Sequence, residues 1–131
     1  MLDPSCLFNL FSANEVITAL VGKRISPEPL QEMLTLPAIT FRQIVTVSDP
    51  TFETSGLQRL RLQVDFWGRT NAQAFALCQA FRQQFNGYQG GLSDETYVQN
   101  FSLISTTDLF EEELLQFRWI SEYYLYFNFS S

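Results

Sequence analysis

The sequence predicts an α+β domain in which an antiparallel sheet of about four strands is backed by one long helix and by N-terminal helices. Two observations carry this prediction. The segment Leu57–Gly68 alternates strictly between apolar and polar residues, a pattern typical of an antiparallel strand with one buried face. The next segment, Asn71–Phe85, places its apolar side chains along one stripe of a helix. We expect this strand and this helix to bury each other's apolar faces.

The length of the chain favours a single domain spanning residues 1–131. It has 131 residues, of which 46% are hydrophobic, enough for one proper core. No apolar stretch approaches the roughly 20 residues that a membrane-spanning helix needs, and no basic run precedes an apolar one at the N-terminus. We therefore expect neither a membrane segment nor a signal peptide.

Two short helices are expected at the N-terminus. The dipeptide Asp3-Pro4 supplies an N-cap acceptor followed by proline at the first helical position. Ser12 and Glu15 have the spacing of a capping box, which predicts a second helix that runs to Val21 and ends at Gly22. A single kinked helix is the alternative.

Four strands are expected from composition and alternation. They are Ala38–Val47, Leu57–Gly68, about Tyr97–Thr107, and Phe117–Phe129. In the third strand, alternation predicts Tyr97 and Phe101 on one face and Val98 on the other. The segments Lys23–Leu36 and Tyr88–Ser93 are rich in proline and glycine respectively, and we expect both to be irregular connections.

The residue types needed for catalysis are largely missing. The chain contains no histidine, which excludes Ser-His-Asp triads, Cys-His dyads and zinc sites of mixed Cys and His type. Cys6 and Cys78 are expected to be buried thiols, with a disulfide or a reactive thiol as the alternative. No paired carboxylates and no phosphate-binding loop are evident. The sequence therefore predicts a protein that is not an enzyme and uses no cofactor or metal.

Arginine and aromatic side chains fall on the strand faces opposite the expected core. They are Arg59, Arg61, Trp67, Tyr124 and Tyr126. These residue types are enriched in protein interfaces and predict a subunit or partner interface, with a second core layer under the N-terminal helices as the alternative. Asp65 has Arg61 and Gln63 as neighbours on the same face, which predicts a surface ion pair. The scattered basic residues do not make a DNA-binding footprint.

The acidic excess lies in the last third of the chain. Residues 1–85 carry seven acids and seven bases, whereas residues 86–131 carry seven acids against Arg118 alone. One segment interleaves acids (Asp108, Glu111, Glu112, Glu113) with large apolar residues (Leu109, Phe110, Leu114, Leu115). A solvated hairpin tip explains the acids, but the apolar residues Phe110, Leu114 and Leu115 suggest docking onto a partner.

Three segments resemble the tail-completion or tail-terminator family of long-tailed bacteriophages. They are Val21–Ile25, Leu36–Ile39 and Arg61–Gly68, the last of these followed by an alanine-rich helix. The resemblance covers nearly the whole chain and is most specific at Asp65-Phe66-Trp67-Gly68. The chain departs from the family in the loop after Asp49, in the connection after Tyr88 and at its glutamate-rich tip.

The resemblance implies a structural virion protein with a single tail-terminator-like domain. It implies a homo-hexameric ring that caps the tail tube, ends tube polymerisation and joins the tail to the head. The implied partners are the tail-tube protein and the head-completion or connector protein. DNA would pass through the channel without specific binding, and the ring, assembled in the host cytoplasm, would sit in the neck of the virion. An acidic rim or channel of Asp108, Glu111, Glu112 and Glu113 would repel that DNA.

Two other classes are compatible with the same sequence. The first is another neck or tail-tube subunit of a phage, which would stack into long tubes. The second is a small-molecule-binding α+β domain, which would hold a closed pocket lined by polar groups.

Overall fold

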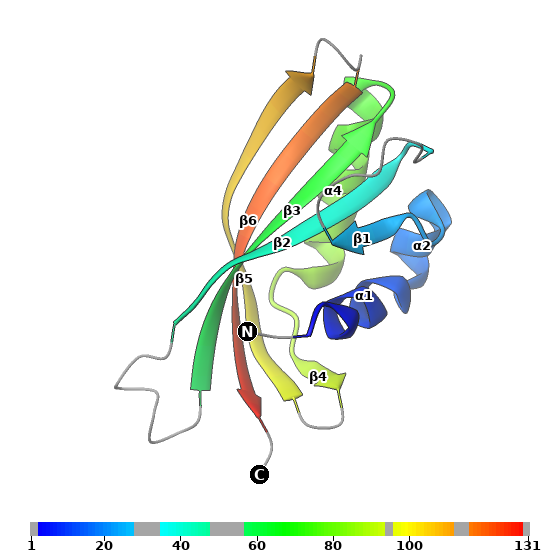
Figure 1. Cartoon of the computed structure of the whole chain (residues 1–131). Helices are drawn as coiled ribbons and strands as arrows, with labels where there is room; N and C mark the ends of the chain where they lie inside the picture. The colour runs from blue at the N-terminus through cyan, green and yellow to red at the C-terminus, as the bar shows by residue number, and fades with distance from the viewer. Residues whose placement is uncertain (1–2, 28–34, 48–56, 94–95, 112–115, 130–131) are drawn as a thin grey trace.

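A single, strongly curved sheet carries the fold in the computed structural model, which describes residues 3–27, 35–47, 57–93, 96–111 and 116–129 (Figure 1). The described strands are β1 Ile25–Pro27, β2 Ala38–Val47, β3 Leu57–Gly68, β4 Gly90–Ser93, β5 Thr96–Glu111 and β6 Gln116–Phe129. Their order across the sheet is β1-β2-β3-β6-β5-β4. The described helices, α1 Pro4–Ser12, α2 Glu15–Val21 and α4 Asn71–Phe85, lie on one face of this sheet (Figure 1).

The fold class predicted from the sequence is wrong. In the described residues the sheet has six strands rather than four, and it is mixed because β1 runs parallel to β2. Its cover consists of short helices, the longest of which has 15 residues, rather than one long helix with accessories. The two strands that were predicted as connections, β1 and β4, have three and four residues and contain proline or glycine. Such short segments show no alternation, and their composition disfavours strands.

The positions of individual strands and helices were predicted more accurately than the fold class. The strands Ala38–Val47 and Leu57–Gly68 and the helix Asn71–Phe85 lie where the sequence pattern placed them. β3 pairs antiparallel with β2 on one side and with β6 on the other, so the alternating segment lies at the centre of the sheet. Strand β5 continues to Glu111, four residues beyond its predicted end.

The N-terminal helices are two separate helices, bent by 92° at the break between them. Asp3 caps α1 as predicted. The cap of α2 is Asn14, whose side chain accepts a hydrogen bond of 3.1 Å from the backbone N of Ile17, so the predicted capping box at Ser12 is wrong by two residues. Gly22 ends α2 with a φ of 60°, a conformation that glycine adopts without strain.

In the described part of the chain, no single helix is long and apolar enough to cross a membrane, and α1 and α2 pass that test only as a bent pair. Both helices turn fully buried side chains into the core, Leu7 and Phe11 from α1 and Ile17 and Val21 from α2.

The core is a cluster of aromatic rings between α4 and the sheet. Phe81 of α4 lies at its centre, with ring centroids 4.7–6.2 Å from those of five other rings. These are Phe11, Phe66, Phe85, Phe101 and Tyr123. Tilted and edge-to-face contacts at such distances are favourable beyond the burial of apolar area. The predicted stripe of α4 and the apolar face of β3 thus bury each other.

A β-bulge decides which side chains of β5 enter this core. The register between β5 and β6 shifts between Val98 and Asn100, which inserts one residue and reverses the faces that follow. As a result Val98 and Phe101 are both fully buried, whereas Tyr97 is exposed. The prediction that Tyr97 and Phe101 share a face is therefore wrong, because alternation in the sequence does not show where a bulge lies.

The two cysteines are free thiols. Cys78 is buried, as expected, with its Sγ atom 3.3 Å from the hydroxyl oxygen of Ser121, and burial raises the pKa of the thiol. Cys6 is half-buried against the core.

Gly68 is the last residue of β3 and lies close to the start of α4. A Cβ atom at this position would lie 2.7 Å from the backbone nitrogen of Ala74 and 3.0 Å from the carbonyl oxygen of Thr70. Both neighbours are backbone atoms of the first turn of α4, so a side chain would displace the helix from the sheet. We expect Gly68→Ala to lower the free energy of unfolding by about 1–3 kcal/mol, measured by urea denaturation.

Gly91 is the matched control. A Cβ atom there would meet no described atom within 4 Å, so Gly91→Ala should change the free energy of unfolding by less than about 0.5 kcal/mol. Equal losses in the two variants would contradict the steric explanation for Gly68.

Candidate interaction surfaces

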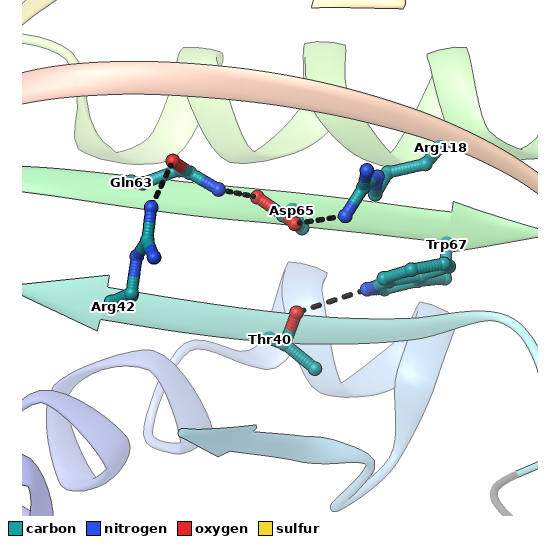
Figure 2. Close-up of polar contacts among 6 residues, drawn as sticks. All are labelled: Thr40, Arg42, Gln63, Asp65, Trp67 and Arg118. Atoms are coloured by element: carbon teal, nitrogen blue, oxygen red, sulfur yellow. Dashed lines mark hydrogen bonds and ion pairs between the residues drawn. The ribbon is translucent and has the colours of Figure 1, made fainter. Parts of the chain in front are cut away.

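The face of the sheet that points away from the helices carries a hydrogen-bonded row of polar side chains (Figure 2). Asp65 of β3 is at its centre and is fully buried. One carboxylate oxygen accepts from Nη1 of Arg118 at 3.1 Å, and the other accepts from Nε2 of Gln63 at 2.9 Å. Gln63 in turn accepts from Nη2 of Arg42 at 3.1 Å. The prediction of a surface ion pair for Asp65 is wrong, because this carboxylate is buried and pairs with a strand distant in sequence.

Trp67 lies beside this row on the same face. Its Nε1 atom donates to the hydroxyl oxygen of Thr40 at 2.9 Å, and the guanidinium carbon of Arg118 is 4.8 Å from the centre of its ring (Figure 2). The side chain packs with Leu36 and Ala38 in a small cluster apart from the main core. Trp67 remains a predicted interface residue, although only 6% of its surface is exposed to a partner.

The other predicted interface residues come together at the opposite end of β3. Arg59 and Arg61 pair with Tyr126 and Tyr124 across the β3–β6 ladder. The guanidinium carbon of Arg59 is 4.6 Å from the ring centre of Tyr124, and the two tyrosine rings are 6.2 Å apart. Arg61 forms an ion pair with Glu122, which raises the pKa of the arginine. All four predicted residues are half-buried, so part of each is open to a partner.

The end of the β5–β6 hairpin exposes apolar side chains beside acids. Asp108 is exposed, and Leu109 and Phe110 are 44% and 43% exposed although both are large and apolar. The ring of Phe110 is 4.7 Å from that of Phe117 across the hairpin. Of the other predicted residues, Glu111 ends β5, and Glu112, Glu113, Leu114 and Leu115 lie outside the described residues.

The outer edge of β5 is covered only over its first half. The backbone N of Gly87 donates to the carbonyl oxygen of Phe101 at 2.6 Å, and the backbone N of Leu103 donates to Oδ1 of Asn86 at 3.1 Å. From Ile104 to Phe110 every residue is exposed, and no described strand pairs with that edge. An uncovered strand edge is a template for pairing with another chain.

Large apolar residues are also exposed at positions that the sequence analysis did not place in an interface, namely Val16, Leu20, Ile44, Phe75, Tyr97, Ile104 and Leu109. Val16 and Leu20 are exposed on one side of α2, and Leu109 is exposed on the open face of the sheet opposite Arg118. Leu109 could have been found by continuing the strand pattern past Thr107. The exposure of the α2 pair depends on how that helix docks, which periodicity alone does not show.

Within the described ranges, no three His, Cys, Asp or Glu side chains lie close enough together to hold a metal ion. The buried carboxylate of Asp65 is held by an arginine and an amide rather than beside a nucleophile. These hydrogen bonds hold the polar side chains of this sheet face in place. They do not set a nucleophile beside a base, as proton transfer would require.

The fold is shared with a chain of a solved structure, described as the virion of a native gene transfer agent (GTA) particle. The TM-score is 0.75, the match covers 95% of this chain and 92% of that chain, and 16% of the residues are identical. At this identity the likeness concerns the fold alone. No match is found among curated proteins.

An open sheet face, an uncovered strand edge and exposed apolar side chains define a structural domain that packs against other protein chains. The chain belongs to the family of the tail completion protein gp17, whose family model matches residues 6–126. It is a structural protein of the phage tail or neck and a component of the virion. The resemblance seen in the sequence is confirmed.

Proposed function

We propose that this protein is the ring-forming subunit that caps the finished tail tube, ends its polymerisation and joins the tail to the head connector. Membership of the tail completion family supports this role. The structural observation that carries it is the β5–β6 hairpin end, where Leu109 and Phe110 stay exposed beside Asp108. Large apolar side chains on a strand end are stabilised when another chain covers them.

A closed ring needs two different surfaces on each subunit, because the same contact must repeat around the axis. The chain offers such surfaces at the two ends of its sheet, the arginine and tyrosine residues at one end and the hairpin end at the other. We propose a homo-hexamer with the tail-tube protein on one side and the head-completion or connector protein on the other.

The proposed ring encloses a channel through which DNA passes. The acidic excess of residues 86–131 supports this role, because carboxylates near the channel repel phosphates and prevent sticking. The ring provides no catalytic step in this proposal, and its assembly takes place in the host cytoplasm.

The test is an infection with a phage that lacks the protein. We expect filled heads without tails and tail tubes longer than normal, observed by electron microscopy, because nothing ends tube growth. Purified protein added to such an extract should restore joined particles. Tails of normal length joined to heads in the absence of the protein would contradict the proposal, and so would purified protein that stacks into long tubes like a tube subunit.

A further inference from the structure

Two surfaces of this chain are complementary in charge. The first, which we call the arginine face, comprises Arg59, Arg61, Tyr124 and Tyr126 on the open side of β3 and β6. The second, which we call the hairpin end, comprises Asp108 and Phe110 of β5, which share one face of the strand opposite Trp119 and Phe117. The first combines cations with aromatic rings, and the second combines a carboxylate with a phenylalanine ring.

The arginine face is positive in an acidic protein. The chain carries a net charge of −6, yet the arginine face has Arg59 and Arg61 against Glu122 alone among the described residues. Arg59 stacks on Tyr124 and pairs with no described carboxylate. An arginine stacked on a ring keeps the edge of its guanidinium group available for bidentate contact with a carboxylate.

The hairpin end has the complementary composition. Asp108 is exposed and pairs with no described cation. Phe110 is 43% exposed and lies two residues further along the same face of β5, whereas Leu109 lies on the opposite face. An exposed carboxylate beside an exposed phenylalanine matches an arginine beside tyrosine rings, since the charges pair while the aromatic rings exclude water around them.

The two surfaces of one chain are too far apart to meet. Arg59 is paired with Tyr126, and Phe110 is paired with Phe117, which lies nine residues away along β6. At roughly 3.3 Å per residue this separation is about 30 Å. The contact can therefore form only between two copies, and it is heterologous, so it closes into a ring when the rotation between copies allows.

We propose that the hairpin end of one copy binds the arginine face of the next copy, with Asp108 pairing with Arg59 while Phe110 covers Tyr124 and Tyr126. This contact rests on the proposed function in that it supplies the repeating interface of the ring. The occupant of the arginine face is thus a second copy of this chain rather than the tail tube or the connector.

The experiment exchanges the charges between the two surfaces. Arg59→Glu gives a chain with an acid on both surfaces, and Asp108→Arg gives a chain with a base on both. By sedimentation from about 1 µM to about 1 mM, a range that spans the affinities of weak and moderate interfaces, each variant should self-associate at least about tenfold more weakly than the natural chain. An equimolar mixture of the two should associate like the natural chain, because every contact in an alternating ring again pairs opposite charges.

Arg82→Glu is the matched control, because it makes the same charge change at an exposed position of α4 outside both surfaces. It should associate like the natural chain, and thermal melting should show that all variants are folded. A mixture no better than its components, unaltered association of Arg59→Glu, or a natural chain that stays monomeric throughout the range would each overturn the proposal.

The experiments distinguish a failure of this contact from a failure of the proposed function. If each single variant supports phage tails of normal length that are joined to heads, the contact is overturned while the capping role stands. If the mixture restores association but the protein proves dispensable for tail completion, the contact stands and the capping role is overturned.

Discussion

Phe81→Ala is expected to lower the free energy of unfolding by about 3–5 kcal/mol. The ring of Phe81 is fully buried and contacts five other aromatic rings from α1, β3, α4, β5 and β6. Removing it leaves a cavity between the helix layer and the sheet. The other rings cannot move in to fill this cavity, because the helices and strands that carry them are fixed by their own packing and hydrogen bonds. Domains of this size are commonly stable by about 5–15 kcal/mol, so the loss is a large share of the total.

Phe75→Ala is the matched control on the same helix. Phe75 is 41% exposed, and its ring centre is 4.9 Å from that of Trp119. Its replacement should cost no more than about 1 kcal/mol. Chemical denaturation of both variants measures the difference, and similar midpoints for the two would show that the cluster around Phe81 is not the centre of the core.

Asp65→Ala is expected to lower the free energy of unfolding by about 3 kcal/mol. The carboxylate is fully buried, and its loss removes the ion pair that it forms with the guanidinium group of Arg118, whose side chain is 20% exposed. The amide of Gln63 loses an acceptor at the same time. Such buried charges cost more when one partner is removed than the intact pair contributes to stability.

Glu122→Gln tests whether burial is the reason that Asp65→Ala is strongly destabilising. Glu122 pairs with Arg61 on the same face, but these side chains are 23% and 39% exposed, so the change should cost less than about 1 kcal/mol. Thermal and urea unfolding of both variants give the comparison. If Glu122→Gln were as destabilising as Asp65→Ala, the difference in burial between the two ion pairs would not control their contribution.

The sequence by itself determined the central elements of this protein. The alternation from Leu60 to Phe66 specified which face of β3 is buried, and the stripe through Leu77 and Phe81 specified which side of α4 covers it. These patterns are local, with periods of two residues and 3.6 residues, so they are visible without knowing which segments meet. The family resemblance rested on the same central region.

The tertiary structure alone decided the sheet order, the faces of β5 and the environment of the polar residues. Strand β1 has three residues and is a strand only because β2 pairs with it. Asp65 is buried because Arg118, 53 residues away, reaches it from β6, and Trp67 is buried beside Thr40, 27 residues away. Such pairings depend on which distant segments the fold brings together, and no local period in the sequence records them.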